Sequence, residues 1–214
     1  MLKLICAFLV TFLTCLFAWG QKDCVLKKDE DSIKVFTCAA EQTRFKTIRA
    51  TFTVNAELSR LAAFVLDIEN YVNWQYNTIQ SRTIKKINEQ EIIFYTEIAA
   101  PWPVSNRDMV TRLRITQDPS TKIVTITTKS VAGLVPPKGN TVRVPMLQAT
   151  WTVVPVSSSR LEVDYVIQID PGGSVPAWMI NLVAAQAPYN SFINLKEKIH
   201  SPPPKNIGVP FIID

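Results

Sequence analysis

The sequence predicts an α+β fold, in which a curved antiparallel sheet of about eight or nine strands surrounds a cavity capped by one long C-terminal helix. Segments of alternating polar and apolar residues follow one another with only turns between them, as in antiparallel sheets. Helical spacing replaces this alternation only near residues 57–67 and again after residue 176. A strongly curved sheet closed by a single helix encloses space that its own side chains need not fill. This space is where we look for function.

The first twenty residues, MLKLICAFLVTFLTCLFAWG, have the pattern of a secretory signal peptide. Lys3 precedes an uncharged apolar run, and Ala18 and Gly20 provide small residues for cleavage before Gln21. The run is shorter than the roughly 20 residues that cross a bilayer as a helix. We therefore expect export to the periplasm or the cell exterior, with an uncleaved anchor as the alternative. The mature domain is expected to span residues 21–200.

The mature chain retains two cysteines, Cys24 and Cys38, at the two ends of a predicted hairpin. Short apolar-alternating runs flank the turn-rich residues 29–32, so a hairpin would bring the cysteines together. An exported protein allows such a pair to oxidise. We predict a Cys24–Cys38 disulfide, with two free buried thiols as the alternative.

The remaining elements follow from changes of period along the chain. Residues 45–54 predict a strand, and a helix is expected over residues 57–67 with Asn55 as its N-cap. A short turn carries Tyr71 and Trp74. Six more extended segments are expected at residues 79–87, 91–99, 107–117, 121–130, 142–156 and 160–169. Pro176 suits the start of a helix over residues 177–198, which contains Pro188, and residues 201–214 predict a Pro-rich extended tail.

Composition excludes several classes of function. The net charge is +5, but no run of Lys and Arg is longer than two, which disfavours nucleic acid as a partner. Neither GxGxxG nor GxxxxGK[ST] occurs, so a nucleotide-dependent enzyme is not expected. The single histidine, His200, leaves no His-rich metal site. We expect no cofactor and no metal.

Three segments resemble the START (steroidogenic acute regulatory protein-related lipid transfer) domain: YVNW at residues 71–74 followed by Ser81, APWPVSNRDMV at residues 100–110, and DPGGSVPAW at residues 170–178. The resemblance spans residues 24–199 and is greater to exported bacterial members. It implies a helix-grip fold around a tunnel that binds one lipid or sterol-like hydrophobic molecule, for transfer or sensing, with transient contact to a membrane surface. A cyclase- or aromatase-like enzyme and an envelope interaction module with a filled cavity are the alternatives.

Strand alternation gives candidate cavity residues. Ile93, Tyr95 and Glu97 share one face, as do Arg107, Met109 and Leu113 on the next strand. If both faces are the interior, Glu97 is its one acid. Steroid-carrying members of the family pair a carboxylate near this position with a basic residue on the next strand, but Leu113 occupies the matching inward position here. Glu97 is therefore expected to be protonated, to be bonded to a ligand hydroxyl, or not to face the interior at all. A position at the wet end of its strand is the further alternative.

The other candidates lie around the expected cavity. Arg107 either fixes the loop 100–106 or forms a solvated pair with Asp108, and the loop 131–140 is either a gate, a membrane-touching edge or an ordinary connection. The C-terminal helix has an apolar stripe that suits a lid or the core. The full set of cavity and lid candidates is Trp74, Tyr95, Glu97, Trp102, Arg107, Met109, Leu113, Trp151, Tyr165, Met179, Leu182, Val183, Gln186 and Tyr189. No catalytic residue is expected.

Overall fold

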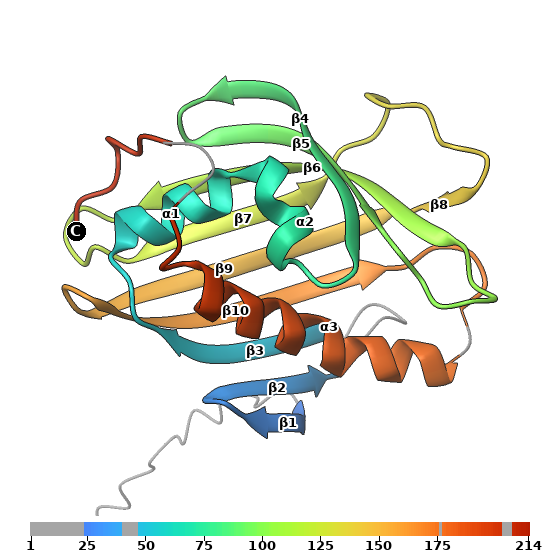
Figure 1. The fold of residues 1–214 in the computed structure, drawn as a ribbon, viewed down its shortest axis with the longest axis horizontal. Coiled ribbons are helices and arrows are strands. Elements are labelled where there is room, and N and C mark those ends of the chain that lie inside the picture. Colours follow the sequence, from blue (N-terminus) through green and yellow to red (C-terminus); the bar gives the residue numbers. More distant parts are fainter. Residues whose placement is uncertain (1–23, 40–46, 176, 203–206) are drawn as a thin grey trace, which may run out of the picture.

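The computed structural model describes residues 24–39, 47–175, 177–202 and 207–214, and for residues 177–179 and 181–183 it describes the backbone alone. The predicted signal peptide therefore lies outside the described residues. The described part has ten strands, three α-helices and one short 3-10 helix (Figure 1). Their bounds are β1 Cys24–Glu30, β2 Ile33–Cys38, β3 Thr47–Val54, α1 Leu58–Leu66, η1 Ile68–Asn70, α2 Tyr71–Trp74, β4 Thr78–Asn88, β5 Glu91–Ile98, β6 Asn106–Gln117, β7 Val124–Ser130, β8 Thr141–Arg143, β9 Met146–Ser157, β10 Arg160–Asp170 and α3 Ala177–Lys198.

The strands form one sheet in the order β1-β2-β3-β10-β9-β7-β6-β5-β4, with β8 added beside β6. All pairs along this order are antiparallel, while β8 runs parallel to β6. The sheet curves, and α1, α2 and α3 all lie against its concave side (Figure 1). The expected α+β helix-grip architecture is confirmed.

The expected strand over residues 142–156 is two strands, which is a correction. Pro145 has no backbone N–H to donate to a ladder, and β8 ends two residues before it. The chain then starts β9 at Met146. Because of this break β8 can lie beside β6, where Arg143 comes opposite Asp108.

The N-cap of α1 also differs from the sequence prediction. The N-cap position is Glu57 rather than Asn55, and its side chain makes no capping hydrogen bond. Instead, the Asp214 carboxylate accepts a hydrogen bond from the backbone N–H of Ser59 at 2.8 Å. A distant acceptor thus satisfies one of the free amides of the first turn.

Residues 207–214 of the predicted tail pack against the rest of the domain. Ile212 is buried, and the Gln117 side chain bonds both the N–H and the carbonyl of Ile213, at 2.8 Å each. No helix within the described residues has the length and apolar character needed to cross a bilayer.

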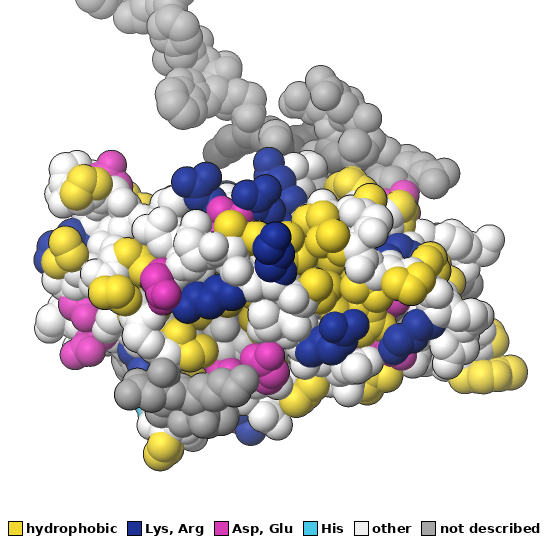
Figure 2. Space-filling model, turned by 90° about the horizontal axis from the view of Figure 1, so that it is seen from above, with side chains coloured by type: hydrophobic (Ala, Val, Ile, Leu, Met, Phe, Trp, Pro, Cys, Tyr) yellow, Lys and Arg dark blue, Asp and Glu magenta, His cyan; other side chains and the backbone are white. Residues whose placement is uncertain are grey.

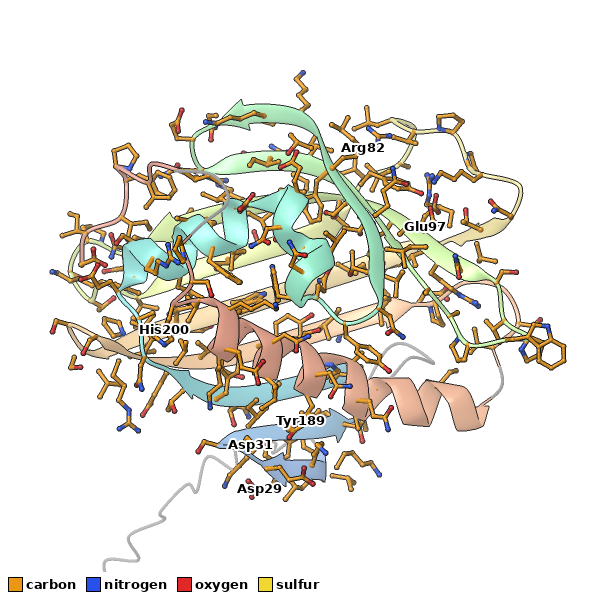
Figure 3. The ribbon with its side chains drawn as sticks, in the orientation of Figure 1. Asp29, Asp31, Arg82, Glu97, Tyr189 and His200 are labelled. Carbon is orange, nitrogen blue, oxygen red and sulfur yellow. A yellow bond between two sulfur atoms is a disulfide. The ribbon has the colours of Figure 1, made fainter. Side chains whose placement is uncertain are left out.

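The hairpin β1–β2 places Cys24 directly opposite Cys38, and the predicted disulfide joins them. The same hairpin contacts α3. The Tyr189 hydroxyl donates to the carboxylate of Asp31, and the Lys28 ammonium lies 3.9 Å from the centre of the Tyr189 ring. Tyr189 of α3 and Asp31 of the hairpin lie close together in Figure 3. The disulfide-closed hairpin therefore holds the middle of α3.

Candidate ligand-binding site

The concave side of the sheet is filled at one end. Four aromatic rings meet beneath the second half of α3: Phe52 and Phe192 stack with centroids 4.3 Å apart, and Trp151 and Tyr165 contact Phe192 edge-on at 5.3 and 5.2 Å. Leu195 of α3 is fully buried beside them. Such rings exclude water and leave no room for a ligand at this end.

The other end of the concave side is less completely covered. Met109, Leu147 and Ala149 are buried, but the apolar side chains beside them, on β5 and β10, are only partly buried. The partly buried side chains are Ile98, Tyr165, Ile167 and Ile169. Ile98 and Ile169 lie at or next to the ends of their strands, and Tyr165 also contacts the aromatic cluster at the filled end. A partly exposed apolar surface on the inner side of a sheet is a surface that a hydrophobic molecule can cover.

Arg107 connects the loops at this end. Its guanidinium donates to the carbonyl of Ser105 and, at 3.3 Å each, to the carbonyls of Pro171 and Gly172. Burial lowers the pKa of Arg107. The expectation that Arg107 fixes the loop 100–106 is met by the Ser105 contact, and the same side chain also fixes the start of the loop into α3.

Gly172 is required where it stands. Its φ is +66°, and a Cβ there would meet the Arg143 carbonyl oxygen at 3.0 Å and the Pro145 Cδ at 3.1 Å. The loop into α3 can therefore approach β8 closely only because residue 172 has no side chain.

Tyr95 and Glu97 do not face the concave side, which corrects the sequence prediction. The register pairs Tyr95 with Val110 and Glu97 with Asp108, so the odd-numbered residues of β5 share a face with the even-numbered residues of β6. Arg107, Met109 and Leu113 point to the opposite, concave side. A shift of one residue between two strands moves every side chain to the other face.

Glu97 is buried on the convex side and has a basic partner after all. Lys138, from the loop between β7 and β8, places its ammonium 2.6 Å from Glu97 Oε2. The Tyr95 hydroxyl donates to the same oxygen at 3.1 Å, and Asn106 Nδ2 donates to Oε1 at 3.3 Å. The hydrogen bond from Lys138 is the main reason that the pKa of Glu97 is lowered, against the effect of burial. Glu97 is therefore ionised, and it is not at the wet end of its strand.

A second ion pair lies beside the first. Asp108 is fully buried, and Arg143 donates to it in a bidentate arrangement, Nε to Oδ1 at 2.8 Å and Nη2 to Oδ2 at 3.1 Å. Arg143 Nη1 also donates to the Val135 carbonyl at 3.0 Å. The two pairs attach the loop 131–140 to the convex side of β5 and β6. Sequence reasoning missed Lys138 and Arg143, because each is distant in sequence from the acid that it contacts.

The remaining candidates lie in several places. Trp74 is buried with Phe64 and Tyr71 in the core, and Trp102 lies on a loop with 91% of its surface exposed. Gln186 is exposed, and Tyr189 packs against the main core while its hydroxyl donates to Asp31 of the β1–β2 hairpin. The side chains of Met179, Leu182 and Val183 lie outside the described residues.

Among the described residues, some buried polar atoms of α2 and of the concave side of the sheet have no hydrogen-bond partner. They are Trp74 Nε1, Ser81 Oγ and Thr111 Oγ1. Thr111 lies opposite Phe94 and two residues from Met109 on the same face, and Ser81 lies opposite Thr96. Buried donors and acceptors of this kind usually have a partner, which can be water or a ligand. Ser81 and Thr111 therefore lie beside Met109, at the less covered end, whereas Trp74 lies in the core.

Basic side chains are spread out on the face of the molecule that Figure 2 shows. Figure 2 shows Lys and Arg side chains along the face above β4, separated by hydrophobic and uncharged ones. Arg82 of β4 lies with its guanidinium 5.2 Å from the centre of the Tyr95 ring, near Glu97 (Figure 3). This pattern differs from the continuous basic stripe of nucleic-acid-binding proteins.

The fold and its concave apolar surface define a helix-grip protein, and the comparisons give the family. The START domain model matches residues 20–193, so the chain belongs to the START domain family. The chain is 27% identical over 175 residues to an uncharacterized protein of Pseudomonas aeruginosa, covering 82% of this chain and 86% of that one. Mouse phosphatidylcholine transfer protein is 29% identical over 121 residues, covering 53% of this chain and 56% of its own length.

Solved structures agree with this assignment. The STAR-related lipid transfer protein of Xanthomonas axonopodis superposes with a TM-score of 0.75 at 26% identity, covering 82% of this chain and 98% of that chain. An aromatase/cyclase of Streptomyces reaches a TM-score of 0.51 at 9% identity, over 73% of this chain and 92% of its own, which shows a shared fold alone. The nearer relatives with names that state a function are thus lipid transfer proteins.

Proposed function

We propose that the protein binds one lipid or similar hydrophobic molecule between the concave side of the sheet and the first half of α3, and that it carries or senses this molecule outside the cytoplasm. The observation that supports this most is the contrast between the two ends of the concave side. One end is filled by Phe52, Trp151, Tyr165 and Phe192, while the other exposes part of Ile98, Ile167 and Ile169.

The magnitude of apolar burial favours a long hydrocarbon chain as the ligand. Burial of one methylene contributes about 0.8 kcal/mol, so a chain of roughly 16 carbons offers on the order of 12 kcal/mol before the costs of binding. The unpartnered hydroxyls of Ser81 and Thr111 can then bond a polar group of the ligand. These polar atoms select among lipids, while the hydrocarbon supplies the affinity.

A carrier without catalysis fits the placement of the acids better than a cyclase does. A general acid or base must reach its substrate. Glu97 and Asp108 point to the convex side, away from the proposed ligand, and each is held by a cation.

Loading from a membrane is supported by the loop that precedes β6. Trp102 exposes 91% of its surface there, and Leu134 and Ile180 are exposed on the loop 131–140 and on α3. Exposed tryptophan suits the interface between headgroups and acyl chains. We propose that this loop makes the transient contact with a membrane surface.

Native mass spectrometry of the protein, purified without detergent from cells that export it, tests the proposal. We expect a bound lipid in the wild type and its loss in Ile167→Asp. Val166→Asp is the matched control, because Val166 is the neighbouring residue on the convex side of β10. The proposal is contradicted if the protein carries no lipid from any extract. It is also contradicted if both variants lose lipid equally while they stay folded.

A further inference from the structure

A polar hollow of about 300 Å³ lies at the opposite end of α3 from the proposed lipid site. It is bounded by the turn between β1 and β2, the end of β3, the start of β10 and the residues at the end of α3. His200, labelled in Figure 3, lies at this end of the helix. The polar residues that line the hollow are Ser32, Thr53, Asn55, Arg160, Lys196 and His200.

The lining is rich in hydrogen-bond donors and positive charge. Arg160 and Lys196 bring two cations, His200 can donate from its ring, and the hydroxyl and amide side chains can donate as well. The lining that the structure describes contains no carboxylate. This combination is what a tetrahedral oxyanion requires, because its oxygens accept several hydrogen bonds at once.

Neither Arg160 nor Lys196 forms an ion pair with an acid among the described residues, although Glu162 lies opposite Thr53 in the ladder. Lys196 Nζ donates to the backbone carbonyl of Asp31 at 2.8 Å, which holds the ammonium in place without cancelling its charge. The Asp31 carboxylate accepts from the Tyr189 hydroxyl. Arg160 forms none of the ion pairs found among the described residues.

The end of α3 would disfavour an anion if its carbonyls faced the hollow freely. Arg60 removes part of that effect. Its Nε donates to the Ile199 carbonyl at 2.7 Å, and its Nη2 donates to the Ser201 carbonyl. The same two bonds fix the backbone on both sides of His200.

From these contacts we infer a second binding site, specific for phosphate-type dianions, in the hollow lined by Arg160, Lys196 and His200. The ligand is either free phosphate, a soluble phosphomonoester or the phosphomonoester headgroup of a lipid. Arg160 forms two parallel bonds to the anion, while Ser32 and Thr53 donate to its remaining oxygens. The site is independent of the apolar concave side, so it can be tested whether or not a lipid is bound there.

Titration of the ¹⁵N-labelled protein with inorganic phosphate at constant ionic strength tests the site. We expect saturable shifts of the amide signals of Ser32, Thr53, Asn55 and His200, with half-saturation in the millimolar range. Arg160→Gln should weaken binding at least fivefold. Lys85→Gln, which removes the same charge from β4, should leave it unchanged. Lys196→Gln tests the site less cleanly than Arg160→Gln, because it also removes the hydrogen bond to the Asp31 carbonyl.

Sedimentation with vesicles distinguishes the sources of the anion. Binding to vesicles of phosphatidylcholine with phosphatidic acid that is lost in Arg160→Gln assigns the site to a lipid headgroup. Phosphate binding without such vesicle binding assigns it to a soluble anion. Absence of saturable shifts, or equal weakening by Arg160→Gln and Lys85→Gln, overturns the inference and leaves the proposed lipid site untouched.

Discussion

Arg143→Met is expected to lower the free energy of unfolding by about 3 kcal/mol at neutral pH. Asp108 has 0% of its side-chain surface exposed and Arg143 has 21%, and the two form a bidentate pair. Removing one partner of a buried pair costs about 3–5 kcal/mol, because the other charge stays buried without compensation. Since Arg143 retains contact with water, we expect the lower end of that range.

The loss of unfolding free energy in Arg143→Met should be larger at neutral pH than at acidic pH. Burial raises the pKa of Asp108, but the hydrogen bonds and charge of Arg143, with smaller contributions from Tyr95 and Lys138, outweigh this effect, so the pKa is lowered. In the wild type the pair therefore stabilises the fold above the unfolded pKa of about 3.9, and this contribution is lost as the pH falls through the folded pKa. In Arg143→Met burial raises the pKa above the unfolded value, so the variant regains stability on acidification. The difference between the two proteins is largest near pH 7 and shrinks toward pH 4.

Urea unfolding at pH 7 and pH 5 measures both effects. Arg49→Met is the matched control, since Arg49 and Asp164 form a bidentate pair at 2.8 Å with side chains that are 47% and 38% exposed. An exposed pair of this kind contributes at most about 1 kcal/mol. Equal losses in the two variants, or a loss in Arg143→Met that does not change with pH, would refute the reasoning.

Three other predictions concern the hairpin, the inner polar atoms and the loop that is proposed to contact a membrane. Replacing both Cys24 and Cys38 with Ser should cost about 3 kcal/mol of unfolding free energy, because the disulfide closes a loop with a sequence separation of 14; an unchanged urea midpoint contradicts this. Thr111→Val removes a buried hydroxyl without a partner, so it should leave the unliganded protein as stable or more stable. The same substitution should weaken the binding of dodecanol more than the binding of dodecane, each measured by displacement of a fluorescent fatty acid. Equal effects on both ligands count against a polar contact. Trp102→Ala should reduce partition onto vesicles roughly tenfold, because insertion of about half of a large apolar side chain is lost; unchanged co-sedimentation excludes this loop as the contact.

Much of the fold follows from local periodicity. The predicted strand over residues 160–169 is β10, Arg160–Asp170, and the predicted helix over residues 57–67 is α1, Leu58–Leu66. Alternation within a strand and spacing within a helix are properties of neighbouring residues, so one sequence contains them. The disulfide between Cys24 and Cys38 was predictable for the same reason, since a hairpin is a local structure.

The site was less predictable because it depends on relations between distant segments. Alternation correctly grouped Tyr95 with Glu97 and Met109 with Leu113, but it could not give the register that puts these pairs on opposite sides of the sheet. The partner of Glu97 is 41 residues away in a loop, and the acceptor for the Ser59 amide is Asp214. No pattern in the sequence connects such residues before the fold brings them together.

Photo-crosslinking is the most direct test of whether a lipid occupies the concave side. A phospholipid with a diazirine in its acyl chain is bound to the full chain, irradiated, and its adducts are mapped by peptide mass spectrometry. We expect adducts on the concave residues Met109, Leu147 and Ile167, and their loss when unlabelled lipid competes. Adducts that fall mainly on convex residues such as Val166 and Gln148, or that persist under competition, would contradict a lipid held between the sheet and α3.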